Sequence, residues 1–227
     1  MIARELLGTA SIPGGDELKL FRRALKGADE YSIMLGRIEL MNSRLSGSEE
    51  ALATLTCKRL AVKNPRILIG GYGMGFTLRA ALAALPPQAN VEVVELIPAI
   101  VKWAREPMAE LTQDCLDDSR VTITTGDVSN VINTADREYD AILLDVDNGP
   151  DGLTHEANDR LYSMAGLEKA KKALRSNGIL AIWSSESDSR FTRRLQKSGF
   201  AVDEETVSAR SNGKGAKHTI WLACKPA

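Results

Sequence analysis

The sequence predicts an α/β fold in which a mostly parallel, seven-stranded sheet ends in an antiparallel hairpin and follows a small β appendage. Three observations support this prediction. Short apolar runs alternate with helical patterns from residue 66 onwards, which is typical of parallel βαβ units. Two further strand-like runs follow Gly199 with a glycine-rich turn between them. Short alternating runs separated by glycine-containing turns precede residue 46.

Composition limits the class of protein. At 227 residues, the chain is long enough for one α/β domain with an N-terminal extension. Its 44% hydrophobic and 26% charged residues are typical of a globular protein. The formal net charge of −1 creates no global field that attracts nucleic acid or an anionic membrane. Residues 1–7 lack a leader pattern and no run is as long as a membrane span, so we expect a cytoplasmic protein.

The N-terminal part, residues 1–45, is predicted to form the antiparallel β appendage. Its alternating runs lie at residues 17–21, 31–35 and 37–41. Residues 46–227 are predicted to form the second unit, which opens with a helix. Ser46 and Glu49 have the spacing of a capping box, in which each side chain bonds to the backbone N–H of the other residue.

The second unit is predicted to alternate strands with helices. The candidate parallel strands are residues 66–70, 91–96, 121–125, 139–145 and 178–184. The candidate helices are residues 75–85, 98–112, 161–175 and 188–198. Asn177 and Gly178 are predicted to end the third of these helices.

The last two runs, residues 200–209 and 218–224, are predicted to pair as an antiparallel hairpin. The glycine-rich segment 211–215 joins them and leaves no room for a helix. A parallel sheet that ends in such a hairpin is the Rossmann-like fold of class I methyltransferases rather than that of nicotinamide dehydrogenases.

A glycine-rich loop follows the first parallel strand and opens a helix. Gly70, Gly71, Gly73 and Gly75 leave backbone N–H groups accessible to a ligand at the helix N-terminus. A dinucleotide fingerprint that starts at Gly71 would require its third glycine at position 76, which is occupied by Phe76. The spacing favours an adenosyl sulfonium ligand over a pyrophosphate, and a tight turn without a ligand is the alternative.

Acidic side chains stand at the ends of the next two strands. Glu95 has the position of a residue that accepts both hydroxyl hydrogens of a ribose, with Leu96 packed below the sugar. Asp127 is predicted to accept a hydrogen bond from the adenine amine while the Val128 backbone N–H donates to the ring. The alternative for Asp127 is a helix cap, and the two roles are compatible.

Asp145 ends the fourth parallel strand and is followed by an acidic loop that contains Asp147 and Asp151. Ligands of open α/β sheets bind at such strand ends, so we expect the loop to border the reaction centre. Asp145 and Asp147 are the candidate catalytic residues, because neighbouring carboxylates raise one another's pKa until one can act as a base. Asp145 is also expected to face the ammonium group of the donor. The alternative is that the loop only binds water or caps helices.

The remaining chemical groups give weaker signals. His155 follows the acidic loop and is a candidate to face a substrate, whereas His218 opens the last strand and is expected to be structural. Neither histidine has a partner at metal spacing, so we predict no metal site. Trp183 ends a central strand and is a candidate to line the acceptor pocket.

These features resemble the spermidine synthase family within the class I methyltransferase superfamily. The resemblance covers about residues 66–224 and is strongest at residues 67–79, 94–98, 126–127 and 139–145. It implies that the glycines and Glu95 hold the nucleoside of S-adenosylmethionine or its decarboxylated form. It also implies that Asp127 binds adenine and that Asp145 is the base.

The sequence departs from that family at residues expected to bind the polyamine. Family members typically carry an aspartate in the glycine loop, where this chain has Met74. They typically carry a second acid after the fourth strand, where this chain has Asn148. A doubly charged diamine requires several anionic partners, because burying an unpaired ammonium group is costly. These departures weaken the case for putrescine as the acceptor.

The sequence leaves several functions open. The first hypothesis is methyl transfer from S-adenosylmethionine to a small-molecule nucleophile, because the sulfonium already activates the methyl group. The alternative is aminopropyl transfer from decarboxylated S-adenosylmethionine to an amine. A non-catalytic nucleoside-binding module is a third possibility, and an NAD dehydrogenase is disfavoured by Phe76 and the hairpin. The apolar N-terminal strands and the resemblance point to a homodimer.

Overall fold

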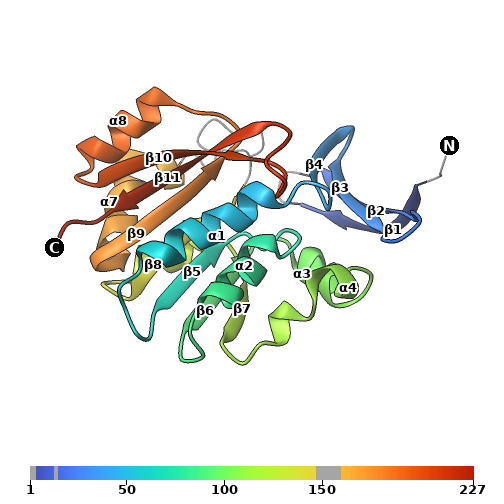
Figure 1. Cartoon of the computed structure of the whole chain (residues 1–227), viewed down its shortest axis with the longest axis horizontal. Coiled ribbons are helices and arrows are strands. Elements are labelled where there is room, and N and C mark those ends of the chain that lie inside the picture. The colour runs from blue at the N-terminus through green and yellow to red at the C-terminus, as the bar shows by residue number, and fades with distance from the viewer. Residues whose placement is uncertain (1–3, 13–14, 147–159) are drawn as a thin grey trace.

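The computed structural model describes residues 4–12, 15–146 and 160–227. These residues form two sheets (Figure 1). The N-terminal sheet consists of β1 (Glu5–Ser11), β2 (Glu17–Arg23), β3 (Glu30–Leu35) and β4 (Ile38–Asn42). The larger sheet consists of β5 (Arg66–Gly70), β6 (Asn90–Glu95), β7 (Val121–Thr125), β8 (Tyr139–Leu144), β9 (Leu174–Ser184), β10 (Ala201–Ser208) and β11 (Lys217–Cys224).

Helices cover both faces of the larger sheet. They are α1 (Gly47–Arg59), α2 (Phe76–Ala84), α3 (Pro98–Arg105), α4 (Ala109–Thr112), α5 (Val128–Thr134), α7 (Met164–Ala173) and α8 (Ser189–Lys197), with a 3-10 helix η1 at Cys115–Asp117. Side chains alternate along each strand, so Ile67 and Ile69 of β5 belong to the cluster that contains α1, α2 and α3. Leu68 belongs to the opposite cluster, with α5, α7 and α8. The result is a three-layer α/β sandwich.

The strand order creates a crevice beside β5. The larger sheet has the order β10-β11-β9-β8-β5-β6-β7. The chain leaves β5 towards β6 and β7 and then returns to the other side of β5 to form β8. All four of these strands are parallel. Loops that follow β5 and β8 therefore diverge at the carboxyl ends of these strands, where α/β sheets place ligands.

The C-terminal hairpin forms as predicted. β10 pairs with β11 in antiparallel orientation, and β11 pairs antiparallel with β9, so the hairpin ends the sheet on one side. The predicted α/β fold with a mostly parallel, seven-stranded sheet is therefore confirmed. Trp221 lies on β11 and is fully buried, as expected for a core residue.

The N-terminal sheet contains one strand more than the sequence predicted. β1 was missed because Gly8 interrupts its apolar pattern and the pairing with β2 is irregular at this point. The structure gives the reason for the glycine: a Cβ at Gly8 would lie 2.5 Å from Nε1 of Trp103 on α3. β1 thus packs closely against α3, and Figure 1 shows the N-terminal sheet beside α3 and α4.

Three local predictions were wrong. The predicted helix 98–112 is broken into α3 and α4, because Pro107 lacks the N–H and sterically blocks a continuous helix. The predicted helix 161–175 contains α7, which ends at Ala173, and Asn177 and Gly178 fall within β9.

The predicted capping box at Ser46 and Glu49 is the third wrong prediction. Within the described residues, the Ser46 side chain makes no capping hydrogen bond, although α1 begins next to it. Instead, the Gly47 N–H donates to the carbonyl of Ala209 at 2.9 Å, which ties the start of α1 to the C-terminal hairpin. In the described ranges, no helix is sufficiently long and apolar to cross a membrane.

Candidate active site

The glycine loop after β5 is shaped by close backbone contacts. Gly71 has φ +84°, a conformation that L side chains rarely adopt, and a Cβ there would collide with the backbone carbonyl of Asp145. Gly73 and Gly75 also have positive φ values, and Gly70 ends β5 against the side chain of Val128. The loop can therefore pass directly beside the end of β8, as the sequence-based hypothesis requires.

Glu95 fastens this loop to the end of β6. Its Oε2 accepts a hydrogen bond from the backbone N–H of Tyr72 at 2.8 Å, and its Oε1 accepts one from Ile97 at 2.8 Å. The residue is only 5% exposed, and burial raises its pKa while the backbone hydrogen bonds oppose that shift. Each carboxylate oxygen has a second lone pair. Ribose binding by Glu95 stays a prediction, and the structure adds a role in shaping the loop.

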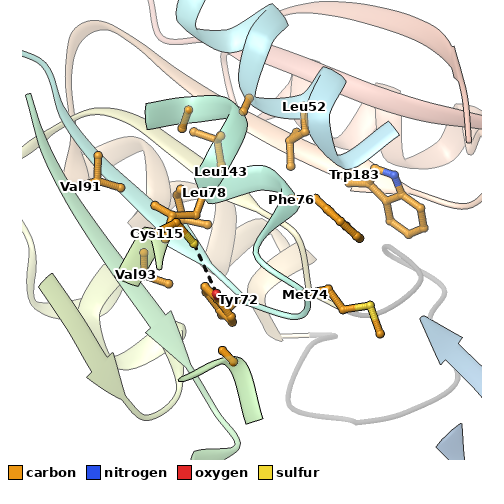
Figure 2. Packing of buried hydrophobic residues seen from close by; sticks show 14 of the residues in the cluster. Leu52, Tyr72, Met74, Phe76, Leu78, Val91, Val93, Cys115, Leu143 and Trp183 are labelled. Atoms are coloured by element: carbon orange, nitrogen blue, oxygen red, sulfur yellow. Dashed lines mark hydrogen bonds between the residues drawn. The ribbon is translucent and has the colours of Figure 1, made fainter. Parts of the chain in front are cut away.

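Tyr72 anchors the loop from below, a role that the sequence analysis did not identify. Its side chain is buried, and its hydroxyl lies 3.4 Å from Sγ of Cys115 (Figure 2). A Cβ at Gly75 would lie 2.8 Å from the Tyr72 hydroxyl oxygen, so the ring packs directly under the loop. Burial raises the pKa of Tyr72 well above its usual range, so its hydroxyl stays protonated.

The predicted adenine site lies at the end of β7. Asp127 caps α5, because its Oδ1 accepts a hydrogen bond from the Ser129 backbone N–H at 2.8 Å. The capping role proposed for Asp127 is thus confirmed, and its contact with adenine stays a prediction. Val128 is buried, whereas Leu96 is 42% exposed at the end of β6. An exposed leucine beside the loop is compatible with the predicted packing under a sugar.

Thr77 links Asp145, at the end of β8, to Glu49, in the first turn of α1. Thr77, at the start of α2, donates a hydrogen bond of 2.6 Å to Oδ2 of Asp145. The Thr77 hydroxyl also lies 3.2 Å from the backbone carbonyl of Glu49. The sequence analysis interpreted Glu49 as part of the capping box and did not place it in the site, because residues 49 and 145 are far apart in the chain.

Both carboxyl groups have raised pKa values. Burial raises the pKa of Glu49 to about 7, and the charge of Asp145 adds to this effect. Burial also raises the pKa of Asp145 to about 6, against the hydrogen bond from Thr77, which lowers it. A carboxyl group with such a pKa can exchange a proton near neutral pH, which a general base must do.

A cluster of apolar side chains packs beside the glycine loop. Met74, Phe76 and Trp183 belong to one buried cluster, and Figure 2 shows them on the side of the loop that faces the N-terminal sheet. Met41 of β4 lies against the loop, since a Cβ at Gly73 would be 3.2 Å from its sulfur. Met74 is 2% exposed, so the position where family members typically carry an aspartate is apolar and packed here.

Several predicted residues lie outside the described residues. They are Asp147, Asn148, Asp151 and His155. Within the described ranges, no group of three or more histidine, cysteine, aspartate or glutamate side chains is arranged to hold a metal ion. The described candidate site thus consists of the glycine loop, the strand-end acids Glu95, Asp127 and Asp145, and the added pair of Glu49 and Thr77.

The sheet order, the switch point and the glycine loop define the Rossmann-like fold of class I S-adenosylmethionine-dependent enzymes. A family model, the spermine/spermidine synthase domain, matches residues 48–195, which is more than half of the chain. The chain therefore belongs to the spermine/spermidine synthase family, and the resemblance inferred from the sequence is confirmed.

Curated relatives include two kinds of transferase. The polyamine aminopropyltransferase of Sulfolobus acidocaldarius is 30% identical over 122 residues, which cover 53% of this chain and 39% of that protein. Putrescine N-methyltransferase 2 of Nicotiana tabacum is 32% identical over 122 residues, which cover 53% of this chain and 33% of that protein. The aligned region thus spans less than half the length of these relatives.

A solved structure supports the fold over almost the whole chain. The spermidine synthase of Thermotoga maritima has a TM-score of 0.75 at 18% identity, covering 97% of this chain and 72% of that one. At this identity, the similarity shows the fold, including an N-terminal sheet followed by the Rossmann-like sheet.

Proposed function

We propose that this chain transfers an alkyl group from a nucleoside sulfonium donor to an amine, with aminopropyl transfer from decarboxylated S-adenosylmethionine as the favoured reaction. The observation that supports this order is the pair of Glu49 and Asp145. From the sequence alone, methyl transfer is the first hypothesis, and the missing family acids at Met74 and Asn148 weaken the case for a diamine acceptor. Glu49 supplies an anion that the sequence did not reveal, and a cationic amine requires such partners.

Donor binding depends in this proposal on the three strand ends. Glu95 uses its remaining lone pairs to accept the ribose hydroxyl groups, and Asp127 uses the oxygen that does not cap α5 to accept from the adenine amine. The glycine loop brings its backbone beside Asp145, so the sulfur of the donor lies near this carboxylate. The exposed Leu96 packs against the sugar.

The proposed chemistry needs little from the protein beyond alignment and one base. The sulfonium makes its attached carbon electrophilic, and the amine lone pair forms the N–C bond as the C–S bond breaks towards sulfur. Asp145 then accepts the proton that the alkylated nitrogen loses. The Thr77 hydroxyl can bond to Asp145 in both protonation states. It donates to the ionised carboxylate. When Asp145 is protonated, the hydroxyl oxygen accepts from Asp145 and its hydrogen points to the Glu49 backbone carbonyl.

Methyl transfer to an amine is the second candidate. The buried Met74 favours it, because an apolar residue in the glycine loop gives no partner to the ammonium group of an aminopropyl chain. Relatives named putrescine N-methyltransferase are consistent with this reaction. In both candidates the acceptor is an amine and the same acid pair receives its proton.

A product assay separates the candidates. The purified chain is incubated with either donor and a panel of mono-, di- and triamines, and products are identified by mass spectrometry. Aminopropyl transfer yields methylthioadenosine and an amine extended by an aminopropyl group, whereas methyl transfer yields S-adenosylhomocysteine and a methylated amine. Asp145→Asn serves as the inactive control. Donor binding without either product would contradict the proposal and favour a non-catalytic module.

A further inference from the structure

A chain of hydrogen bonds leads from the acid pair to the C-terminal hairpin. Ser48, in the first turn of α1, is fully buried. Its Oγ lies 2.6 Å from Oε2 of Glu49 and 2.9 Å from Nδ1 of His218 on β11. One hydroxyl thus connects a carboxyl group of the candidate site to an imidazole ring 170 positions further along the chain.

This series of hydrogen bonds can conduct a proton because each of its groups can act both as a donor and as an acceptor. When Glu49 is ionised, His218 donates from Nδ1 to Ser48, and Ser48 donates to the carboxylate. When Glu49 is protonated, it donates to Ser48, and Ser48 donates to an unprotonated Nδ1. Glu49 passes its proton to Ser48, and Ser48 passes its own hydroxyl proton to Nδ1 of His218. This transfer converts the second arrangement into the first and leaves the ring with protons on both nitrogens. His218 then releases the proton from Nε2, so atoms and charge balance.

The surroundings of both end groups suit this exchange. Asp145, just after β8, and Glu50, on α1, are the charged groups that raise the pKa of Glu49, and Glu95 acts in the same direction on Asp145. His218 is half-buried, so it can reach solvent where the acid pair is desolvated. Burial lowers the pKa of His218, which keeps the resting ring neutral near neutral pH and favours release of a proton that the ring has received.

Trp183 holds the imidazole in place. The two rings meet edge to face, with centroids 4.9 Å apart and an interplanar angle of 81°. Pairing of β11 with β9 places the two residues on adjacent strands. A fixed ring orientation matters, because only Nδ1 lies within hydrogen-bond distance of Ser48.

We propose that Ser48 and His218 form a proton relay that carries a proton taken up by the Glu49 carboxylate out to solvent. The kinetic part of this proposal rests on the proposed transferase function. Ser48 and His218 are positioning and relay residues that act through Glu49, so their loss affects proton release rather than binding of the donor or the amine.

Kinetics of variants test the relay during turnover. We expect Ser48→Ala and His218→Gln to lower kcat on the order of tenfold, with KM changed by less than about twofold and a larger solvent deuterium isotope effect. Ser48→Thr restores the hydroxyl and should restore kcat, and added imidazole should rescue His218→Ala. The matched control is Thr56→Val, since Thr56 is a buried hydroxyl on α1 that bonds only the Leu52 carbonyl among the described contacts. Unchanged kcat, or a loss without an isotope effect or rescue, overturns the relay.

A spectroscopic test needs no turnover and separates failure of the relay from failure of the proposed function. Nitrogen-15 NMR of His218 should show the Nε2–H tautomer below and the Nδ1–H tautomer above the pH at which Glu49 ionises, about 7. Ser48→Ala should abolish this switch, and Thr56→Val should retain it. A constant tautomer in the wild-type protein overturns the relay, even if the transferase is active. A clear switch without any product overturns the transferase function alone.

Discussion

At the scale of single residues, Asp145 at the end of β8 makes the stability of the fold depend on pH. Burial raises the pKa of Asp145 to about 6 in the folded chain, compared with about 4 in an unfolded one. The folded state therefore binds more protons in this range, and stability falls as the pH rises from about 4 through 6. Above about pH 6, the folded state carries the full free-energy cost of burying the ionised Asp145 carboxylate.

Asp145→Asn should remove this cost while it retains an oxygen that can accept from Thr77. A shift of about two pKa units corresponds to at most about 3 kcal/mol, so we expect the Tm of the variant to exceed that of the wild type by up to about 6 to 12 °C at pH 8. At pH 4 the two Tm values should agree, because Asp145 is protonated there. Calorimetry at both pH values measures the difference. A variant that is less stable at pH 8 than at pH 4, relative to wild type, would contradict the raised pKa.

Thr77, on α2, modulates the pKa of Asp145 through its hydrogen bond to that carboxylate. Its hydrogen bond lowers the pKa of Asp145, so Thr77→Val should raise that pKa further, by about one unit. Thr77→Ser retains the hydroxyl and serves as the control with an unchanged pKa. Carbon-13 NMR of the Asp145 carboxyl group during a pH titration measures both variants. An identical titration midpoint in Thr77→Val and in wild type would show that the hydrogen bond has no effect on the pKa of Asp145.

The sequence predicted those candidate site residues that stand at strand ends. Glu95, Asp127 and Asp145 each follow a strong β pattern, and parallel strands bring their carboxyl ends to one edge. Glu49 and His218 could not be placed in the same way. Glu49 lies at the start of α1 and His218 lies on β11, and Ser48 connects the two side chains. A local sequence pattern holds no information about which helix start packs against which strand.

At the scale of elements, the glycine loop depends on one close approach between β5 and β8. Gly71→Ala should destabilise the fold by about 1 to 3 kcal/mol and weaken binding of S-adenosylhomocysteine or methylthioadenosine at least about tenfold. The reason is the collision of the new Cβ with the Asp145 carbonyl, in addition to the positive φ.

Gly213 offers a matched control for this variant. It has φ +78°, close to the +84° of Gly71, but a Cβ there would meet no described atom within 4 Å. Gly213→Ala should therefore cost about 1 kcal/mol and leave nucleoside binding unchanged. Urea denaturation and titration calorimetry measure both effects. Equal losses in the two variants would mean that backbone strain alone, without the collision, explains the cost at Gly71.

Elements were predictable wherever one periodicity persisted for a whole segment. Each of the seven strands of the larger sheet overlaps its predicted range, although β9 begins four residues early, at Leu174. The central strands β5 and β8 are nearly continuous in apolar residues because helices cover both faces of the sheet, whereas β10 is largely polar and exposed. The errors lie where a single residue overrides the pattern. Pro107 divides one predicted helix. Gly8 interrupts the apolar pattern of β1, and its missing side chain leaves space for Trp103.

For the whole molecule, the relation between the two sheets decides how the chain unfolds. The sequence predicted residues 1–45 as a separate appendage. In the structure, Leu20 and Ile33 of the N-terminal sheet are fully buried in the same hydrophobic cluster as Ile67 of β5. Met41 also contacts the glycine loop. A shared core couples the stability of both sheets, so we expect a single cooperative transition.

Leu20→Ala tests this coupling, because it creates a cavity in the N-terminal part of the shared cluster. The free energy of unfolding of the entire chain should fall by about 2 to 5 kcal/mol, with coincident transitions in far-UV circular dichroism and tryptophan fluorescence. Leu6→Ala is the control in β1, since Leu6 is 51% exposed and its loss should cost less than about 0.5 kcal/mol. If Leu20→Ala instead produced an early transition that left the tryptophan signal unchanged, the N-terminal sheet would fold as its own unit. Its contact with the glycine loop could then be broken without unfolding the proposed nucleoside site.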